Sequence, residues 1–422
     1  MKRILVISWF YPPVNSSEGL VTFKLLNNSR YEYDVFTQNS STDWSYGRNV
    51  VLKNHANVHS IFGKSKYIVD WKEEAYQYFK KHWQEYDCIM TRSMPQESHE
   101  VGLRIKKEFP QIKWIASFGD PVKDNPYQHI NCSLHSPYGM DNLINRHKST
   151  RYRLSPKRMA LSAYWTIRHR DCVRIRKELA RIENETMLLA DKIILNNESQ
   201  KRYMASDAQT AAKTVVIHHS YDPDFYPKAV AEANQKLRFL FLGHLDVIRT
   251  AYPLLQAIKD LKEDVPDLAE HAEFAFYGDM ADSDLVFVVK NDLLDVVKFH
   301  KPISYLESLE EMQNADWLVH IDGNIGLVSD ENIFFAAKVA DYFGSGTNIL
   351  AITMPEGDIA DILRSANELV LSFSANEIKE YLYLIICQGY QITPNRDYIA
   401  QFAAKAVAAE FDAKVLGEYY DA

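Results

Sequence analysis

A lysine and an aspartate three residues apart are, by their type and spacing, the residues of this chain best suited to chemistry. Lys338 and Asp341 belong to an apolar, helix-spaced stretch in residues 332–355, NIFFAAKVADYFGSGTNILAITMP. Residues three apart share a face of a helix. The stretch passes two glycines and runs into residues 348–352, an apolar segment typical of a buried strand. A cation and an acid at such a helix and loop edge can hold a phosphate and a sugar hydroxyl, although the pair could also be an exposed helical ion pair.

Apolar runs alternate with helical patterns along both halves of the chain. In the first half we expect strands at 4–7, 33–37, 88–91, 114–117, 192–195 and 215–217, and helices at 19–26, 69–83, 97–108 and one ending at 190. In the second half we expect strands at 237–242, 274–277, 296–299, 317–321, around 349 and at 369–371, and helices at 253–261, 304–313 and around Lys338. An alanine-rich, amphipathic helix is expected from 397 to 417. This rhythm predicts parallel sheets with right-handed crossovers.

The length and this alternation predict two α/β domains. A chain of 422 residues is too long for one core. Residues 1–221 and 237–396 are the expected doubly wound, Rossmann-like domains, and residues 222–236, with Pro223 and Pro227, are the expected linker. Open parallel sheets bind ligands at the carboxyl ends of their strands, so we expect the site in the cleft between the two domains.

The composition excludes several classes of protein. The net charge of -8 argues against a nucleic-acid partner. The cysteines lack CxxC spacing, which favours a reducing compartment and predicts no zinc site; they are Cys88, Cys132, Cys172 and Cys387. The histidines at 218, 219 and 300 lack metal-ligand spacing, so no metal is expected. The opening MKRILVISWFYPP is read as a first strand rather than a signal peptide, and no run is long enough to span a bilayer. We expect a cytoplasmic protein, with peripheral contact to the inner face of the plasma membrane left open.

Five segments, in this order along the chain, carry a family resemblance: ILVISWFYPPVNSSEG, WIASFGDP, ENETMLLADKIILNN, FLFLGHLDVIRTAYPLLQAI and KVADYFGSGTNILAI. In them the chain resembles the two-domain (GT-B) glycosyltransferases, most closely the retaining family 4 type of bacterial polysaccharide assembly. The resemblance implies an acceptor-side first domain, a nucleotide-sugar-binding second domain, and a C-terminal helix, 397–422, that crosses back to the first domain.

The resemblance also implies roles for five donor-binding residues. Gly243 would form the tight turn after a strand, and Arg249 would neutralise the donor diphosphate. Lys338 would sit near the same phosphates, and Asp341 takes the place of a glutamate that holds the ribose hydroxyls. Gly19 would let backbone amides approach the phosphate at a helix N-terminus. Fixed positive charge is needed there because the leaving group is a nucleoside diphosphate.

The chain departs from the family pattern at four positions: His244 for an arginine, Thr250 for a lysine, Ile333 for the first of two glutamates, and Gly119 for a histidine. The acids nearest to Ile333 are Asp330 and Glu331. Asp120, at the carboxyl end of the strand 114–117, is the candidate catalytic residue, a polar group near the reacting carbon. Because it precedes a proline, it could also be only a turn residue. The departures bear on catalysis more than on the fold.

The function implied by the resemblance is transfer of a sugar from a nucleotide-sugar donor to a glycan or lipid-linked acceptor in bacterial surface polysaccharide synthesis. The nucleotide sugar is a substrate, so no cofactor is expected. Basic side chains and a helix dipole would replace a metal. Two alternatives stay open: a sugar-nucleotide epimerase on the same fold, and a non-catalytic partner subunit. The run Asp282-Ser283-Asp284, which mimics a metal motif of another glycosyltransferase fold, is read as a solvated loop.

A basic stretch at 146–177 stands out in this acidic chain. It holds eleven lysines or arginines against one acid, with apolar and aromatic residues between them. Such a stretch suits an anionic membrane surface or a diphosphate-linked acceptor, and it could also be a solvated helix face. RNA is disfavoured because no stacking platform is evident. The residues expected to face the acceptor or membrane are Arg151, Arg153, Lys157, Arg158, Arg168 and Arg170.

Overall fold

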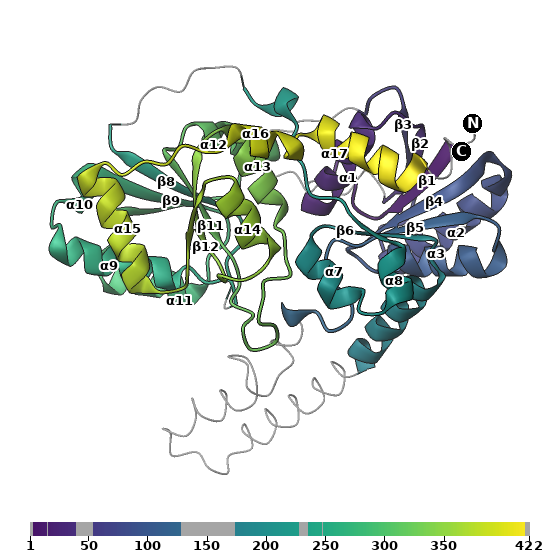
Figure 1. Cartoon of the computed structure of the whole chain (residues 1–422), viewed down its shortest axis with the longest axis horizontal. Helices are drawn as coiled ribbons and strands as arrows, with labels where there is room; N and C mark the ends of the chain where they lie inside the picture. Colours follow the sequence, from purple (N-terminus) through teal and green to yellow (C-terminus); the bar gives the residue numbers. More distant parts are fainter. Residues whose placement is uncertain are drawn as a thin grey trace, which may run out of the picture.

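Two parallel β-sheets, one in each half of the chain, form the framework (Figure 1). The computed structural model describes residues 3–14, 16–38, 54–127, 174–227, 235–246 and 248–417. The first sheet has the order β3-β2-β1-β4-β5-β6-β7 and the second has the order β10-β9-β8-β11-β12-β13. The strand pairings among the described residues are all parallel, and the predicted α/β fold with two Rossmann-like sheets is confirmed.

The first sheet contains β1 (Arg3–Ser8), β2 (Tyr33–Thr37), β3 (Val58–Phe62), β4 (Tyr86–Arg92), β5 (Lys113–Ser117), β6 (Lys192–Leu195) and β7 (Thr214–Val216). Its helices are α1 (Ser17–Asn28), α2 (Ile68–His82), α3 (Glu97–Glu108), a helix over 174–189, α7 (Glu198–Met204) and α8 (Ala208–Ala212).

The second sheet contains β8 (Leu237–Leu242), β9 (Ala272–Tyr277), β10 (Val297–His300), β11 (Trp317–Ile321), β12 (Asn348–Ile352) and β13 (Leu369–Leu371). Its helices are α9 (Tyr252–Asp264), α10 (Leu268–His271), α11 (Asp282–Lys290), α12 (Tyr305–Gln313), α13 (Ala337–Ser345), α14 (Asp358–Ser365) and α15 (Ala375–Gln388). The chain closes with α16 (Arg396–Ile399) and α17 (Ala404–Phe411).

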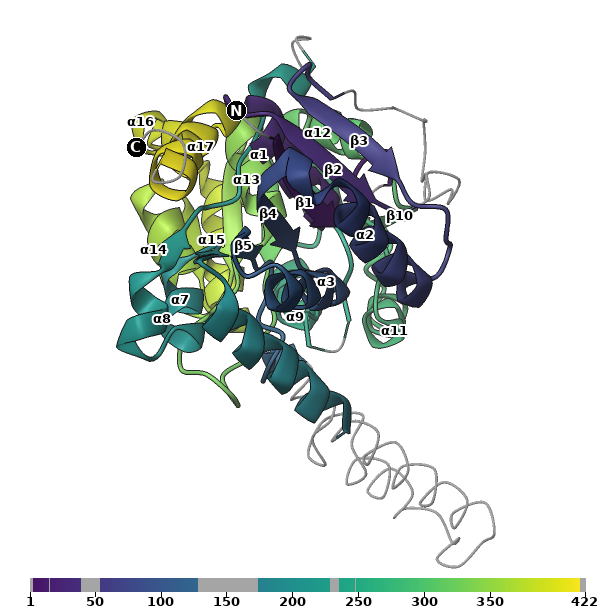
Figure 2. The same ribbon diagram turned by 90° about the vertical axis from the view of Figure 1, so that its right-hand side faces the viewer.

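Both faces of each sheet are buried, which is why its strands are nearly continuous apolar runs. In β1, Leu5 and Ile7 join the cluster under α2 and α3, whereas Ile4 and Val6 join the cluster under α1 and α17. Figure 2 shows these two pairs of helices on opposite sides of the first sheet. In the second sheet, one cluster lies under α9 and α15 and the other under α12, α13 and α14. The alternation follows from the two-residue period of a strand.

Several elements differ from the expectation. The helices α7, α8, α10, α14 and α15 were not predicted. The edge strand β3 was not predicted, because its burial alternates irregularly and its run is short. The segment Asp282-Ser283-Asp284, expected as a solvated loop, begins helix α11. Its last residue, Asp284, is buried and accepts hydrogen bonds from the Thr250 hydroxyl and the Ala251 amide, both at 3.0 Å. This carboxylate therefore anchors the start of α9, and the solvated-loop interpretation was wrong.

The chain crosses from one sheet to the other twice, and the two crossing segments are hydrogen-bonded to each other. The Tyr221 amide donates to the Phe402 carbonyl at 3.0 Å, and the Ala404 amide donates to the Tyr221 carbonyl at 2.7 Å. This bridge holds Ala403 in an extended conformation, so the helix expected from 397 to 417 is interrupted there. Beyond the break, α17 packs on the first sheet through Val407 and Phe411. Among the described residues no helix is long and apolar enough to cross a membrane.

Candidate functional site

A cavity of about 350 Å³ lies between α1 of the first domain and the loops at the carboxyl edge of the second sheet. Three predicted donor-binding residues line it: Gly243, Lys338 and Asp341. The first domain contributes Ser17, Leu20, Val21 and Lys24 from α1. The second domain adds the ends of β8 and β9, the segment after β10, and the first turns of α12 and α13. The spatial grouping follows from the parallel sheet, because all its carboxyl-end loops meet at one edge.

Gly243 is required by its backbone and by its neighbour. It follows β8 with φ of +133°, a conformation that side chains rarely adopt. A Cβ atom at this position would also lie 2.7 Å from the Lys338 ammonium. The turn thus leaves room for the ammonium to approach the end of the strand.

Lys338 places a desolvated ammonium at the end of β8. Its Nζ donates to the Leu242 carbonyl at 2.8 Å and lies 4.5 Å from the centroid of the Phe241 ring. Burial first, and then the charge of Arg249, lower the pKa of this ammonium to about 7, and Asp322 acts in the opposite sense. No described carboxylate forms an ion pair with Lys338, so its charge is free to meet an anion from outside.

Arg249 is the second cation at this edge, although it does not line the cavity. Its Nη2 donates to the Tyr127 hydroxyl at 3.3 Å, and its guanidinium carbon is 5.9 Å from the centroid of that ring. Its Nε is buried and has no hydrogen-bond partner among the described residues. A buried donor without a partner is costly unless a ligand satisfies it. Arg249 and Lys338 together therefore form a site that favours an anion.

Asp341 is held by two donors that come from different domains. Its Oδ1 accepts from Lys24 Nζ at 2.8 Å and from the Tyr305 hydroxyl at 3.0 Å. No hydrogen bond to its Oδ2 occurs within the described part of the chain, so this oxygen can accept one from a ligand. Lys338 and Asp341 share helix α13 but have different partners, and the alternative of an exposed helical ion pair between them is wrong.

Asp120 follows β5 and does not line the cavity; the charges that act on it are those of Glu18 and Arg92 from the first domain and Arg249 from the second. Burial raises the pKa of its carboxyl group to about 7, and Glu18 adds to the rise, whereas Arg92 and Arg249 oppose it. Glu18 in turn forms an ion pair with Arg92 at 2.7 Å. A carboxyl group with such a pKa changes its charge near neutral pH and is a candidate for catalysis.

The two remaining glycines at the site are explained by packing. A Cβ atom at Gly119 would lie 2.6 Å from the Glu18 carboxylate, so a side chain at the position of the family histidine would require this carboxylate, which pairs with Arg92, to move. Gly19 is the third residue of α1, and a Cβ there would lie 3.1 Å from the Tyr11 amide nitrogen. Gly19 does not line the cavity; it lets the helix approach the loop after β1.

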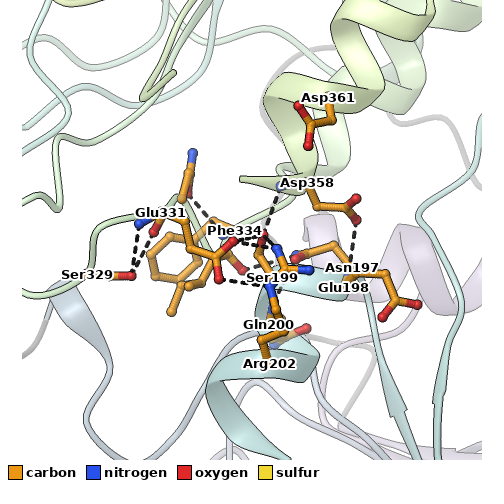
Figure 3. A network of polar contacts seen from close by, with 12 residues as sticks. Asn197, Glu198, Ser199, Gln200, Arg202, Ser329, Glu331, Phe334, Asp358 and Asp361 are labelled. Atoms are coloured by element: carbon orange, nitrogen blue, oxygen red, sulfur yellow. Dashed lines mark hydrogen bonds and ion pairs between the residues drawn. The ribbon is translucent and has the colours of Figure 1, made fainter. Parts of the chain in front are cut away.

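The position of the missing first glutamate is apolar. Ile333 is buried in a cluster with Ile248 and Phe334. The neighbouring Glu331 points to the first domain, where it accepts from Ser199 at 2.8 Å and from Arg202 Nε at 3.1 Å (Figure 3). Neither residue lines the cavity, so Glu331 does not replace the glutamate there.

The other two departures have ordinary partners. His244 lines the cavity and lies 3.8 Å from the Asp279 carboxylate. Thr250 donates to Asp284 and so supports the start of α9.

Four residues that sequence reasoning missed stand at the site: Lys24, Tyr127, Tyr305 and Asp322. Asp322 carries a usable signal, because it directly follows the buried strand β11 at its carboxyl end. Its Oδ2 accepts from Thr353 at 2.7 Å and from Asn332 at 2.9 Å. Lys24 and the tyrosines carry no comparable signal, since each is a single residue in an otherwise ordinary helix or loop.

The predicted acceptor or membrane residues between Arg151 and Arg170 lie outside the described residues. In the part of the chain that the structure covers, no group of histidines, cysteines and acids is arranged to hold a metal ion.

The low pKa of Lys338 predicts a pH dependence of stability. Between about pH 7 and its ordinary value of 10.5, the unfolded chain binds a proton at Lys338 that the folded chain does not. Raising the pH through this window therefore favours the folded state, by up to about 1.4 kcal/mol per pH unit from this residue. Urea unfolding at pH 7, 8 and 9 should show the wild type gaining stability relative to Lys338→Met. The exposed control Lys290→Met should stay parallel to the wild type, and a parallel Lys338→Met curve would contradict the burial of the ammonium.

Comparison with known proteins identifies the fold. No family model and no curated protein sequence matches the chain. Among solved structures, a sucrose-phosphate synthase from Thermosynechococcus elongatus matches with a TM-score of 0.65 at 14% identity over 100% of both chains. HepE from Anabaena, in complex with UDP, matches with a TM-score of 0.59 at 12% identity over 99% of this chain and 100% of that one. The lipopolysaccharide outer core galactosyltransferase WaaB matches with a TM-score of 0.56 at 10% identity over 99% of both chains. At these identities the likeness establishes the fold, and the chain has the two-domain GT-B fold of these glycosyltransferases.

Proposed function

We propose that this chain is a glycosyltransferase that moves a sugar from a nucleotide-sugar donor to a glycan or lipid-linked acceptor. The observation that carries the proposal is the pair of cations, Arg249 and Lys338, at the carboxyl edge of the second sheet beside Asp341. Neither cation forms an ion pair with a carboxylate among the residues the structure describes. Charge that is desolvated in advance and aimed at one place suits a group that becomes more negative during a reaction.

A nucleoside diphosphate fits this arrangement. Its phosphates would accept from Lys338 and from the unpartnered Nε of Arg249. Its ribose hydroxyls would donate to Asp341, which lines the same cavity. The solved structures of Anabaena HepE with UDP and with UDP-glucose support a donor of this class.

The chemistry of transfer assigns a task to each group. The bond between the anomeric carbon and the diphosphate oxygen breaks, and its electron pair goes to the diphosphate, where Arg249 and Lys338 stabilise the added charge. The sugar gains oxocarbenium character, and Asp120, ionised, would stabilise it from the first domain. The acceptor hydroxyl bonds to the anomeric carbon, and its proton passes to the departing diphosphate oxygen. Because two basic side chains neutralise the leaving group, the proposal includes no metal, and a retaining outcome follows from the family resemblance.

A panel of UDP, GDP, ADP and CDP, each free and as a glucose conjugate, tests the proposal by thermal shift. A ligand at a hundred times its dissociation constant stabilises a protein by roughly 2.7 kcal/mol, a measurable shift. A donor-hydrolysis assay then separates the activities, since a transferase releases free nucleoside diphosphate, an epimerase interconverts the sugars and a non-catalytic protein does neither. Absence of binding to every nucleotide would refute the proposal.

The two cations should be needed for transfer. Arg249→Ala and Lys338→Ala should each lower kcat/KM by roughly a hundredfold, the scale for one preorganised charge stabiliser. The control Lys290→Ala removes an exposed ammonium from α11 and should leave kcat/KM unchanged. Full activity in both site variants would move the donor site elsewhere.

Asp120 should set the acid limb of the pH profile. Its carboxyl group has a pKa of about 7, raised by burial, and the ionised form is the one that stabilises the sugar. The value of kcat should therefore fall about tenfold per pH unit below 7, and Asp120→Asn should lower kcat by roughly a hundredfold and abolish this limb. Substitution of Glu368 is the matched control. Burial raises the pKa of its carboxyl group to about 7 as well, yet this group only accepts a hydrogen bond from the Ile349 amide. If Asp120→Asn keeps the acid limb, this carboxylate takes no part in the reaction.

We place the acceptor and a membrane contact at the basic stretch 146–177, in keeping with a role at the inner face of the plasma membrane in bacterial surface polysaccharide synthesis. The support is its eleven basic residues against one acid in a chain of net charge -8. Changing Arg151, Arg153, Lys157, Arg158, Arg168 and Arg170 together to glutamate should abolish sedimentation with anionic vesicles or raise the acceptor KM, because salt-screened attraction becomes repulsion. Nucleotide binding should be retained. A variant that still sediments and keeps its acceptor KM would show that the stretch is a solvated face.

A further inference from the structure

A lysine from the first domain reaches into the second domain at the cavity. Lys24 belongs to α1, and its ammonium forms an ion pair at 2.8 Å with Asp341 of α13, 317 residues further along the chain. The side chain of Lys24 is 1% exposed and that of Asp341 is 9% exposed. Both residues line the same cavity as Gly243 and Lys338. The pair therefore lies within the site and not on the outer rim of the domain interface.

The geometry around Asp341 leaves one of its oxygens for a ligand. Lys24 and the Tyr305 hydroxyl both donate to Oδ1. Two donors on one oxygen fix the orientation of the carboxylate plane, while Oδ2 accepts no hydrogen bond from any described residue. A carboxylate held in this way can accept from a diol without first losing its own partners, and the ammonium lies against it as a counter-ion in a buried place.

We propose that Lys24 is a positioning residue of the donor site, which holds Asp341 for the ribose diol and makes ribose recognition depend on contact between the two domains. This inference rests on the proposed nucleotide-sugar function. Lys24 touches Asp341 and acts on the ribose through it. Because the ammonium and the carboxylate come from different domains, the oriented carboxylate exists only when α1 and α13 lie together. A ligand that binds this arrangement better than any other shifts the domains toward it.

Other polar contacts also join the domains and provide a comparison (Figure 3). Arg202 and Ser199 donate to Glu331, and the Asp358 amide donates to Ser199 at 2.8 Å. These residues do not line the cavity, and Arg202 is more than half exposed. If Lys24 only held the domains together, loss of the Arg202 contact would have the same kind of effect on ligand binding. If Lys24 positions Asp341, only its own loss should change the recognition of the ribose.

The experiment compares each nucleoside diphosphate with its 2′,3′-dideoxy counterpart, using UDP, GDP and ADP. The wild type should prefer the diol form of the diphosphate it binds by about tenfold to a hundredfold, the range for hydrogen bonds to a charged group. Lys24→Met should lose this preference, mostly through weaker binding of the diol form, while affinity for the dideoxy form changes little. Arg202→Gln is the matched interdomain control and should keep the preference.

A mutational cycle makes the positioning role distinguishable from a structural one. Asp341→Asn should abolish the diol preference, and adding Lys24→Met to it should change the preference no further, because residues that act through one group are not additive. Thermal unfolding of each variant checks that it is folded. Where Lys24→Met does not fold, Lys24→Gln takes its place, since the shorter, neutral amide cannot make the same contact with the carboxylate.

The outcomes separate the two proposals. If the wild type prefers the diol and the folded Lys24 variant keeps that preference, Lys24 has no positioning role and the proposed function stands. An equal loss of affinity for the diol and dideoxy forms in the Lys24 variant would also overturn the inference, because it would indicate a purely structural contact. If the wild type binds none of the three diphosphates and none of the wider nucleotide panel, the proposed function fails and the inference fails with it.

Discussion

Positive charge at the carboxyl edge of the second sheet, which forms no ion pair with any described carboxylate, is the constraint on which the site depends. Removing an ammonium from water is unfavourable, and the lowered pKa of Lys338 reflects that cost. A carboxylate beside Lys338 would remove this desolvation cost, but it would also neutralise the charge that makes the site. Acids are close at hand, but Asp322 is engaged by Thr353 and Asn332, and Asp341 by Lys24 and Tyr305. The hydrogen bonds of these acids thus keep the cations available.

The surrounding fold supplies what such a site needs. Parallel strands bring the loops after β8, β9 and β11 to one edge, and the left-handed turn at Gly243 leaves space for the ammonium. The apolar cluster under α12, α13 and α14 holds α13 against the second sheet, so the backbone that carries Lys338 and Asp341 is fixed although the ammonium of Lys338 is desolvated. The stability of the core on both faces offsets the local cost at the edge.

Local patterns in the sequence were sufficient for the framework. Strands such as β6, β8 and β11 lie at the predicted residues, because strands buried on both faces are short apolar runs with clear ends. The edge strand β3 lacks that pattern, and its half-exposed residues resemble a loop. The helix α11 was missed because its first turn is acidic, a composition that suits both a helix N-terminus and a solvated loop. The sequence pattern cannot distinguish a helix N-terminus from a solvated loop here. The hydrogen-bond donor that decides between them, the Ala251 amide that binds Asp284, lies far along the chain.

The site was predictable only in part for the same reason. The spacing of Lys338 and Asp341 shows that they share a helix face, but not that their side chains diverge toward β8 and α1. Lys24 could not be identified, since a single lysine in a helix has no signal until the domains are placed. The glycine at position 119, where the family has a histidine, is likewise explained only by its contact with Glu18 in the folded protein.

The contacts between the domains differ in how firmly they can hold. The ion pair of Glu331 with the exposed Arg202 contributes little, because water can replace it at small cost. The buried pair of Lys24 and Asp341 differs, because separating it requires water to enter and hydrate both charges. The covalent passages meet at the bridge of Tyr221 with Ala403, where backbone hydrogen bonds add to the packing of Tyr221 and Phe402. The buried pair of Lys24 and Asp341 joins the domains and also lines the ligand cavity, so the energetics of the interface and of the site are coupled.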